Sequence, residues 1–106
     1  IVDPGEQPVQ PALNPGEVRI VGGIDGYINA TQNPNVVIRF RRTSAGIVTV
    51  KVYDLRGRLV MEKTKDGPAG MDDEITWRAD GVPVGVYIVV VKGGGIGRTH
   101  RTAVIR

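Results

Sequence analysis

The chain of 106 residues contains no cysteine and no long hydrophobic run. The absence of cysteine excludes disulfides, thiolate catalysis and cysteine-ligated zinc, but it leaves the cellular compartment open. Because nowhere do about 18 apolar residues follow one another, the sequence predicts no transmembrane helix. A chain of this length is expected to form one domain with a single modest core.

Aromatic residues are also scarce. There are five of them, namely Tyr27, Phe40, Tyr53, Trp77 and Tyr87. The net charge is +3, and the 14 basic residues are interspersed with 11 acidic ones. Nucleic-acid binding requires basic residues clustered with stacking aromatics, so we predict no nucleic-acid partner.

Residues for catalysis are few. Ser44 is the only serine and His100 the only histidine. A Ser-His-acid triad needs both side chains close together with an acid that orients the imidazole. Ser44 follows the second predicted strand and His100 lies in the last one, and nothing in the sequence brings them together. We therefore predict that the chain is not an enzyme and binds no cofactor.

Four prolines lie near the start of the chain, at positions 4, 8, 11 and 15. This spacing favours an extended, polyproline-like spacer. We interpret residues 1–17 as a linker from a preceding domain and residues 18–106 as the folded domain. Because the chain begins with Ile1, we also interpret it as part of a longer polypeptide, in which any signal peptide would lie upstream.

From residue 18 onward, short β-branched runs alternate with Gly, Asn, Asp and Pro, and no stretch keeps a helical period. The predicted strands are 18–21, 36–41, 47–54, 58–63, 74–78, 86–92 and 99–105. About seven short strands indicate an all-β protein, an immunoglobulin-like antiparallel β-sandwich. A small barrel is the alternative. Strand 86–92 is apolar on both faces, so we expect it to be central and covered on two sides.

The stretch VKVYDLRGRLV, residues 50–60, is typical of a hairpin. Asp54-Leu55-Arg56-Gly57 fits a type I turn in which Asp54 accepts backbone hydrogen bonds and Gly57 takes a positive φ before a bulge. These residues predict a structural turn without chemistry of its own.

Several motifs occur in a characteristic order. Asn33-Pro34 precedes an apolar strand, V-Y-D-x-x-G-x-x-V covers residues 52–60, and Trp77 is followed by a polar turn and G-x-Y at Gly85 and Tyr87. Over about residues 18–106 the chain resembles the FlgD-like immunoglobulin domains and the related C-terminal sorting domains of type IX secretion. It departs from them at Trp77-Arg78-Ala79, where the family usually has Trp-Asp-Gly.

This resemblance implies a non-catalytic accessory module of secreted or surface multidomain bacterial proteins, often at the C-terminus. Gly85 and Tyr87 would be turn residues, with the Tyr87 hydroxyl meeting backbone at a corner. The module would space a neighbouring domain of the same polypeptide or present a surface to export or anchoring machinery, with the last strand and Arg106 as the first place to examine. The expected location is extracellular or the cell surface. Flagellar hook assembly is suggested only by the family name.

Surface interaction is the other functional hypothesis. Arg39, Arg41 and Lys51, with Arg42, Arg56 and Arg58 in flanking loops, could form a basic patch for an acidic partner such as a surface polysaccharide. Charged side chains on exposed strands also simply prevent aggregation. A carbohydrate-binding module of a polysaccharide-degrading enzyme is the alternative function, in which Tyr27 and Tyr53 would be the exposed rings, while Trp77 fits a core position better.

Three further motifs have plain structural interpretations. Asp72-Asp73-Glu74, with Asp66 nearby, could offer oxygens to calcium, but no D-x-D-x-D-G loop is present and an acidic solvated loop is favoured. Asn29-Ala30-Thr31 matches a glycosylation acceptor and is interpreted as a polar loop. The run 93–95 of three glycines predicts a flexible hairpin loop between the last two strands.

Overall fold

The computed structural model describes residues 13–21, 23–24, 27–29 and 35–105. Within these residues the chain forms strands and turns only, so no helix there could cross a membrane. The strands are β1 (Val18–Val21), β2 (Gly23–Ile24), β3 (Tyr27–Asn29), β4 (Asn35–Arg41), β5 (Gly46–Asp54), β6 (Leu59–Gly67), β7 (Asp72–Arg78), β8 (Gly85–Gly93) and β9 (Ile96–Ile105).

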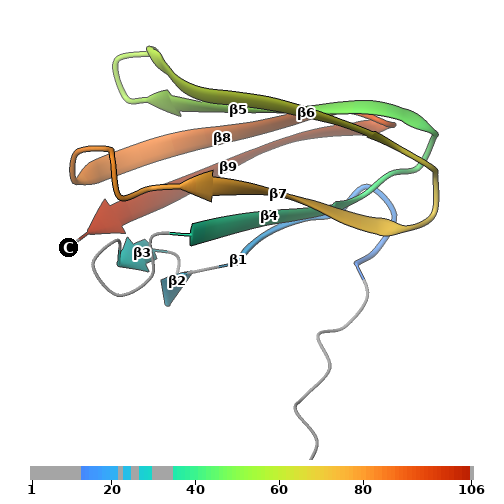
Figure 1. Cartoon of the computed structure of the whole chain (residues 1–106), viewed down its shortest axis with the longest axis horizontal. Coiled ribbons are helices and arrows are strands. Elements are labelled where there is room, and N and C mark those ends of the chain that lie inside the picture. Colours follow the sequence, from blue (N-terminus) through green and yellow to red (C-terminus); the bar gives the residue numbers. More distant parts are fainter. Residues whose placement is uncertain (1–12, 22, 25–26, 30–34, 106) are drawn as a thin grey trace, which may run out of the picture.

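The strands form two sheets (Figure 1). One is three-stranded with the order β1-β4-β7, and the other is six-stranded with the order β2-β3-β9-β8-β5-β6. Their pairings are antiparallel except where the short β3 runs parallel to β9. The predicted all-β sandwich is confirmed, and seven of its strands have four residues or more. β2 and β3 were not predicted, because a strand of two or three residues is too short to show the alternation of apolar and polar residues.

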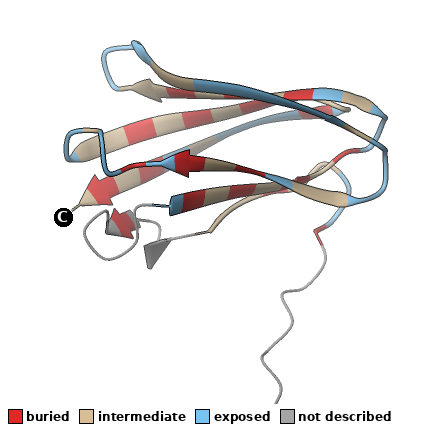
Figure 2. Cartoon of the chain, in the orientation of Figure 1, coloured by how far each residue is buried: buried red, intermediate tan, exposed pale blue. Residues whose placement is uncertain are grey.

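Alternating side chains create the core between the sheets. On β4, Val36, Ile38 and Phe40 are fully buried while the residues between them are half-buried, as the banding in Figure 2 shows. β5 repeats this pattern at Val48, Val50 and Val52. Successive side chains of a strand point to opposite faces, so each strand contributes every second residue to the core.

β8 lies between β9 and β5, in the central position that its sequence predicts. The expectation that both of its faces are covered is wrong. Tyr87, Val89 and Val91 are buried, but Val86, Ile88 and Val90 on the other face are only half-buried. Among the described residues no further layer covers this outer face, so the apolar side chains there remain partly in solvent.

Arg42, directly after β4, closes one end of the core. Its side chain is 1% exposed, and its guanidinium lies over the Phe40 ring, 5.2 Å from the ring centre. Nη1 donates to Asp73 Oδ2 at 2.8 Å, Nε to the Gly46 carbonyl at 2.9 Å and Nη2 to the Lys65 carbonyl at 2.6 Å. The prediction of an exposed Arg42 in a surface patch is therefore wrong, because the local pairing turns its side chain inward between the sheets.

Asp73 completes this cluster from β7. Besides Arg42, Lys65 from β6 contacts its carboxylate, with Nζ 2.6 Å from Oδ1. Partial burial raises the pKa of Asp73, but hydrogen bonds from Lys65, Arg42 and the Glu74 amide outweigh it and lower the pKa to about 2. The carboxylate is therefore charged throughout the physiological range, and it ties the edge of one sheet to the edge of the other.

The β8–β9 turn lies at the same end of the sandwich. Gly94 and Gly95 have φ values of 59° and 80°, the positive values that a two-residue type I′ hairpin turn requires. The Gly94 carbonyl accepts hydrogen bonds from the amides of Thr43 and Ser44 at 2.8 and 3.1 Å. A Cβ on Gly95 would overlap the Thr43 hydroxyl. The glycine run is thus a tight, docked turn and not the flexible loop that we predicted.

The segment before β1 also contacts this end, which we call the Arg42 end. Leu13 is buried at 3% exposure, and its amide donates to Asp72 Oδ2 at 3.2 Å. The Gly16 amide donates to the Arg41 carbonyl at 3.0 Å. Residues 13–17 of the predicted linker therefore pack against the sandwich, while residues 1–12 lie outside the described part of the chain.

Candidate recognition groove

The β5–β6 turn is held by Asp54, at the end of the sandwich opposite Arg42. Asp54 Oδ1 accepts from the amides of Arg56 and Arg58, both at 2.9 Å, and its carbonyl accepts from the Gly57 amide at 3.0 Å. Gly57 has φ 84°. The turn is therefore a β-turn closed by a glycine in the left-handed region, as a type I turn followed by a bulge requires, and the register shifts between Val52 and Tyr53.

The connection between β7 and β8 faces this turn. Its conformation is fixed where the Tyr87 hydroxyl donates to the Pro83 carbonyl at 2.6 Å. The Tyr87 ring is buried and meets Trp77 edge to face, with ring centres 5.7 Å apart. This geometry anchors the connection to the core through one aromatic side chain that is apolar along its body and polar at its tip.

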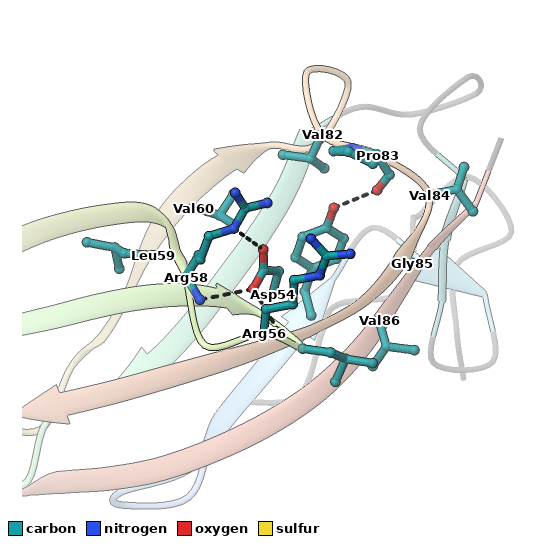
Figure 3. A pocket seen from close by; sticks show the side chains of 12 residues that line it. Asp54, Arg56, Arg58, Leu59, Val60, Val82, Pro83, Val84, Gly85 and Val86 are labelled. Carbon is teal, nitrogen blue, oxygen red and sulfur yellow. Dashed lines mark hydrogen bonds and ion pairs between the residues drawn. The ribbon is translucent and has the colours of Figure 1, made fainter.

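A hollow of about 590 Å³ lies between the turn and the connection, and Figure 3 shows its side chains. We call it the end groove. Its lining residues are Asp54, Leu55, Arg56, Arg58, Leu59, Val60, Val82, Pro83, Val84, Gly85, Val86 and Tyr87. Leu55, Leu59 and Val84 are 67%, 51% and 58% exposed. The two other large apolar side chains exposed in the described chain, Ile47 and Met71, belong to segments at the Arg42 end.

The end groove carries one uncompensated positive charge. Asp54 Oδ2 accepts from Arg58 Nε at 3.1 Å. The hydrogen bond from the Arg58 amide lowers the pKa of Asp54 most, and desolvation opposes it; with the further help of the Arg58 guanidinium and the Arg56 amide, the pKa stays below its ordinary value. Asp54 is therefore ionised and paired. The guanidinium of Arg56, in contrast, is exposed and makes no hydrogen bond or ion pair with the described residues.

Comparison with known families identifies the domain. Residues 31–106 match the model of the secretion system C-terminal sorting domain. The chain belongs to this family. No curated protein matches it. Of the two relationships that the sequence suggested, the one with type IX sorting domains is shown and the one with FlgD-like domains is not.

Membership of the family establishes the general role. The sorting domain is a non-catalytic module, and it marks a protein as secreted or located at the cell surface. The matched span contains β4 to β9, and hence the whole end groove.

The three predicted basic residues lie on different sheets of the sorting domain. Arg39 and Arg41 project from β4 and both contact Asp72, at 3.2 and 3.4 Å. Lys51 projects from β5 in the other sheet and pairs with Glu62 at 3.5 Å. The expectation of a shared basic patch is wrong, because consecutive strands β4 and β5 cross from one layer to the other.

The predicted aromatic platform is not assembled in the described residues either. Trp77 and Tyr87 are 3% and 4% exposed and belong to the core. Tyr53 is half-buried on the outer face of the six-stranded sheet. The side chain of Tyr27, like the motif Asn33-Pro34, lies outside the described residues. Only one partly exposed ring therefore remains in the described chain, and a carbohydrate-binding role has no support.

The acidic run on β7 is divided between two faces. Asp72 faces Arg39 and Arg41 on the outside, and Asp73 faces Arg42 and Lys65 between the sheets. No group of three metal-binding side chains forms in the described part of the chain. Ser44 lies at the Arg42 end, whereas His100 pairs with Val89 in mid-strand, so the topology keeps them apart.

Two corrections concern the end groove itself. Gly85 is not in a turn, because it begins β8 and pairs with Val104. Sequence reasoning placed Arg56 and Arg58 in loops but did not recognise the groove. The sequence DLRGRLV did contain a signal for the groove. A type I turn needs Asp and Gly at its ends, but it does not need an exposed leucine inside it, so Leu55 could have indicated an interaction site.

Proposed function

We propose that the sorting domain is recognised by the export machinery through its end groove. The supporting observation is the concentration of three exposed apolar side chains, Leu55, Leu59 and Val84, around a single hollow. Exposed apolar surface costs solvation free energy, and in soluble proteins a contiguous patch of it is typical of an interaction site. No catalytic step is required, since binding alone would commit the attached protein to export.

The position of the groove fits such a role. Residues 13–17 enter the fold at the Arg42 end, where Leu13 contacts Asp72 and Gly16 contacts Arg41. A domain preceding them in the same polypeptide would be tethered at that end (Figure 1). The end groove lies at the other end of the sandwich, so a tethered neighbour would leave it accessible. The rigid sandwich would thus also act as a spacer.

Export of a reporter tests this proposal. The full chain is fused to the C-terminus of a secreted reporter in a bacterium with type IX secretion, and the exported fraction is measured. We expect the triple variant Leu55→Ser, Leu59→Ser, Val84→Ser to lose most export. The matched control Ile47→Ser, Met71→Ser removes exposed apolar side chains at the Arg42 end and should be exported normally. Equal export of both variants, with both folded, would refute recognition through the groove.

A further inference from the structure

We propose that the end groove binds a protein segment in which an apolar side chain is flanked by carboxylates, an inference that rests on the recognition role proposed above. Three features of the groove carry it. They are an apolar lining, a guanidinium at its edge that has no partner among the described residues, and walls that are held in place before any partner arrives.

The lining selects an apolar side chain. Leu55, Leu59 and Val84 are the exposed large apolar side chains of the groove, and Val60 and Val82 below them are half-buried and pack against the hydrophobic core. A partner side chain placed between the two loops would remove apolar surface from water on both molecules. The volume of about 590 Å³ lies within the range of typical ligand pockets.

The charges select a carboxylate. Two guanidinium groups, those of Arg56 and Arg58, border the groove, and only one carboxylate, Asp54, accompanies them. Asp54 is already engaged by Arg58 and by two backbone amides. Arg56 is therefore the group left to bind a partner, and a planar guanidinium binds a carboxylate through two parallel hydrogen bonds.

The fixed walls favour a protein segment over a lipid surface. The turn is held by Asp54 and the facing connection by the hydrogen bond from Tyr87 to Pro83, so neither must be ordered on binding. The surface between them is hollow. A flat bilayer would reach the side chains at the rim, such as Leu55, but not Val60 and Val82 below it, whereas an inserted side chain contacts both.

Titration of the full chain with defined peptides tests the inference. The probes are a hexapeptide that alternates leucine with glutamate and its counterpart that alternates leucine with lysine, each followed by amide chemical shifts of the ¹⁵N-labelled protein. We expect the glutamate peptide to shift the signals of residues 54–60 and 82–87 and to bind at least fivefold more tightly than the lysine peptide. The substitution Arg56→Gln should weaken binding of the glutamate peptide about fivefold. Arg101→Gln, the same change of charge at an exposed position on β9, should not.

Other outcomes would overturn the inference. These are equal affinity for the two peptides, no binding of either, shifts confined to the Arg42 end, or binding of phosphatidylglycerol vesicles through the groove without binding of peptide. Failure here is distinguishable from failure of the proposed function. If the triple groove variant loses export while the glutamate peptide does not bind, only the partner's chemistry is wrong. If the triple variant is exported normally, recognition through the groove is itself wrong.

Discussion

The hydroxyl of Tyr87 donates a 2.6 Å hydrogen bond to the carbonyl of Pro83, four residues earlier in the chain. This bond joins the buried Tyr87 of β8 to the connection that forms one wall of the end groove. Because the Tyr87 ring also contacts Trp77, the wall is attached to the core of the sandwich. The groove is therefore part of the folded domain and depends on the same contacts that stabilise it.

Removal of this hydroxyl is expected to weaken the domain measurably. In Tyr87→Phe the ring still packs on Trp77, but the Pro83 carbonyl loses its donor. We expect the free energy of unfolding to fall by about 1 kcal/mol, the usual net value of a hydrogen bond. Tyr53→Phe serves as control, since Tyr53 is half-buried on the outer sheet face. Urea unfolding of both variants checks the prediction, and an equal loss in the two would contradict it.

Arg42 is expected to be the most important charged residue for stability. Arg42→Met leaves Asp73 with one of its two cations and removes the guanidinium donors of the Gly46 and Lys65 carbonyls. Breaking a buried ion pair in this way costs about 3–5 kcal/mol. Arg41→Met is the control, because Arg41 is more exposed and Asp72 keeps Arg39; its cost should stay within about 1 kcal/mol. Comparable melting temperatures for the two variants would contradict the importance of Arg42 for stability.

The lowered pKa of Asp73 predicts how the free energy of unfolding depends on pH. Its pKa is about 2 in the folded domain and 3.8 in an unconstrained chain, so below pH 4 the unfolded state binds more protons. The stabilisation is therefore complete above about pH 4 and is lost as the pH falls toward 2. Asp73→Asn should be less stable than wild type at pH 7, and the difference should shrink across this window. Urea unfolding measured at several pH values checks it; a constant difference would contradict it.

The β5–β6 turn gives a test of backbone conformation. Gly57 has φ 84°, a region that costs other residues about 1–2 kcal/mol, so Gly57→Ala should destabilise by about that amount. Gly85→Ala is the matched change at a glycine that lies in a strand and has open space around its Cβ position. It should change stability by less than about 0.5 kcal/mol. Equal effects of the two substitutions in thermal unfolding would be inconsistent with the turn as described.

The sequence predicted those parts of the fold that depend on local pattern. The period-two alternation of β4 and β5 located the core, and Asp54 and Gly57 located a turn. Prediction from the sequence failed where contacts between distant segments decide whether a side chain is buried. Nothing local distinguishes Arg42, which is buried, from Arg41, which is not, because its burial depends on Asp73 and on two carbonyls of other segments.

The candidate site was missed for the same reason. The end groove joins a hairpin turn to a connection about 25 residues later, and its shape follows from the packing of β5 against β8. The prediction of a basic patch was wrong because the order of strands in a sheet does not follow from their order in the chain. Arg39 and Lys51, close in sequence, face outward from opposite layers.

Competition during export tests recognition through the end groove most directly. The full chain is produced in excess in cells that export a reporter fused to the same sorting domain, and the rate of reporter export is followed. We expect the unaltered chain to slow export and the triple variant at Leu55, Leu59 and Val84 to slow it much less, at equal amounts of folded protein. Equal slowing by both chains would show that the machinery recognises another surface of the domain.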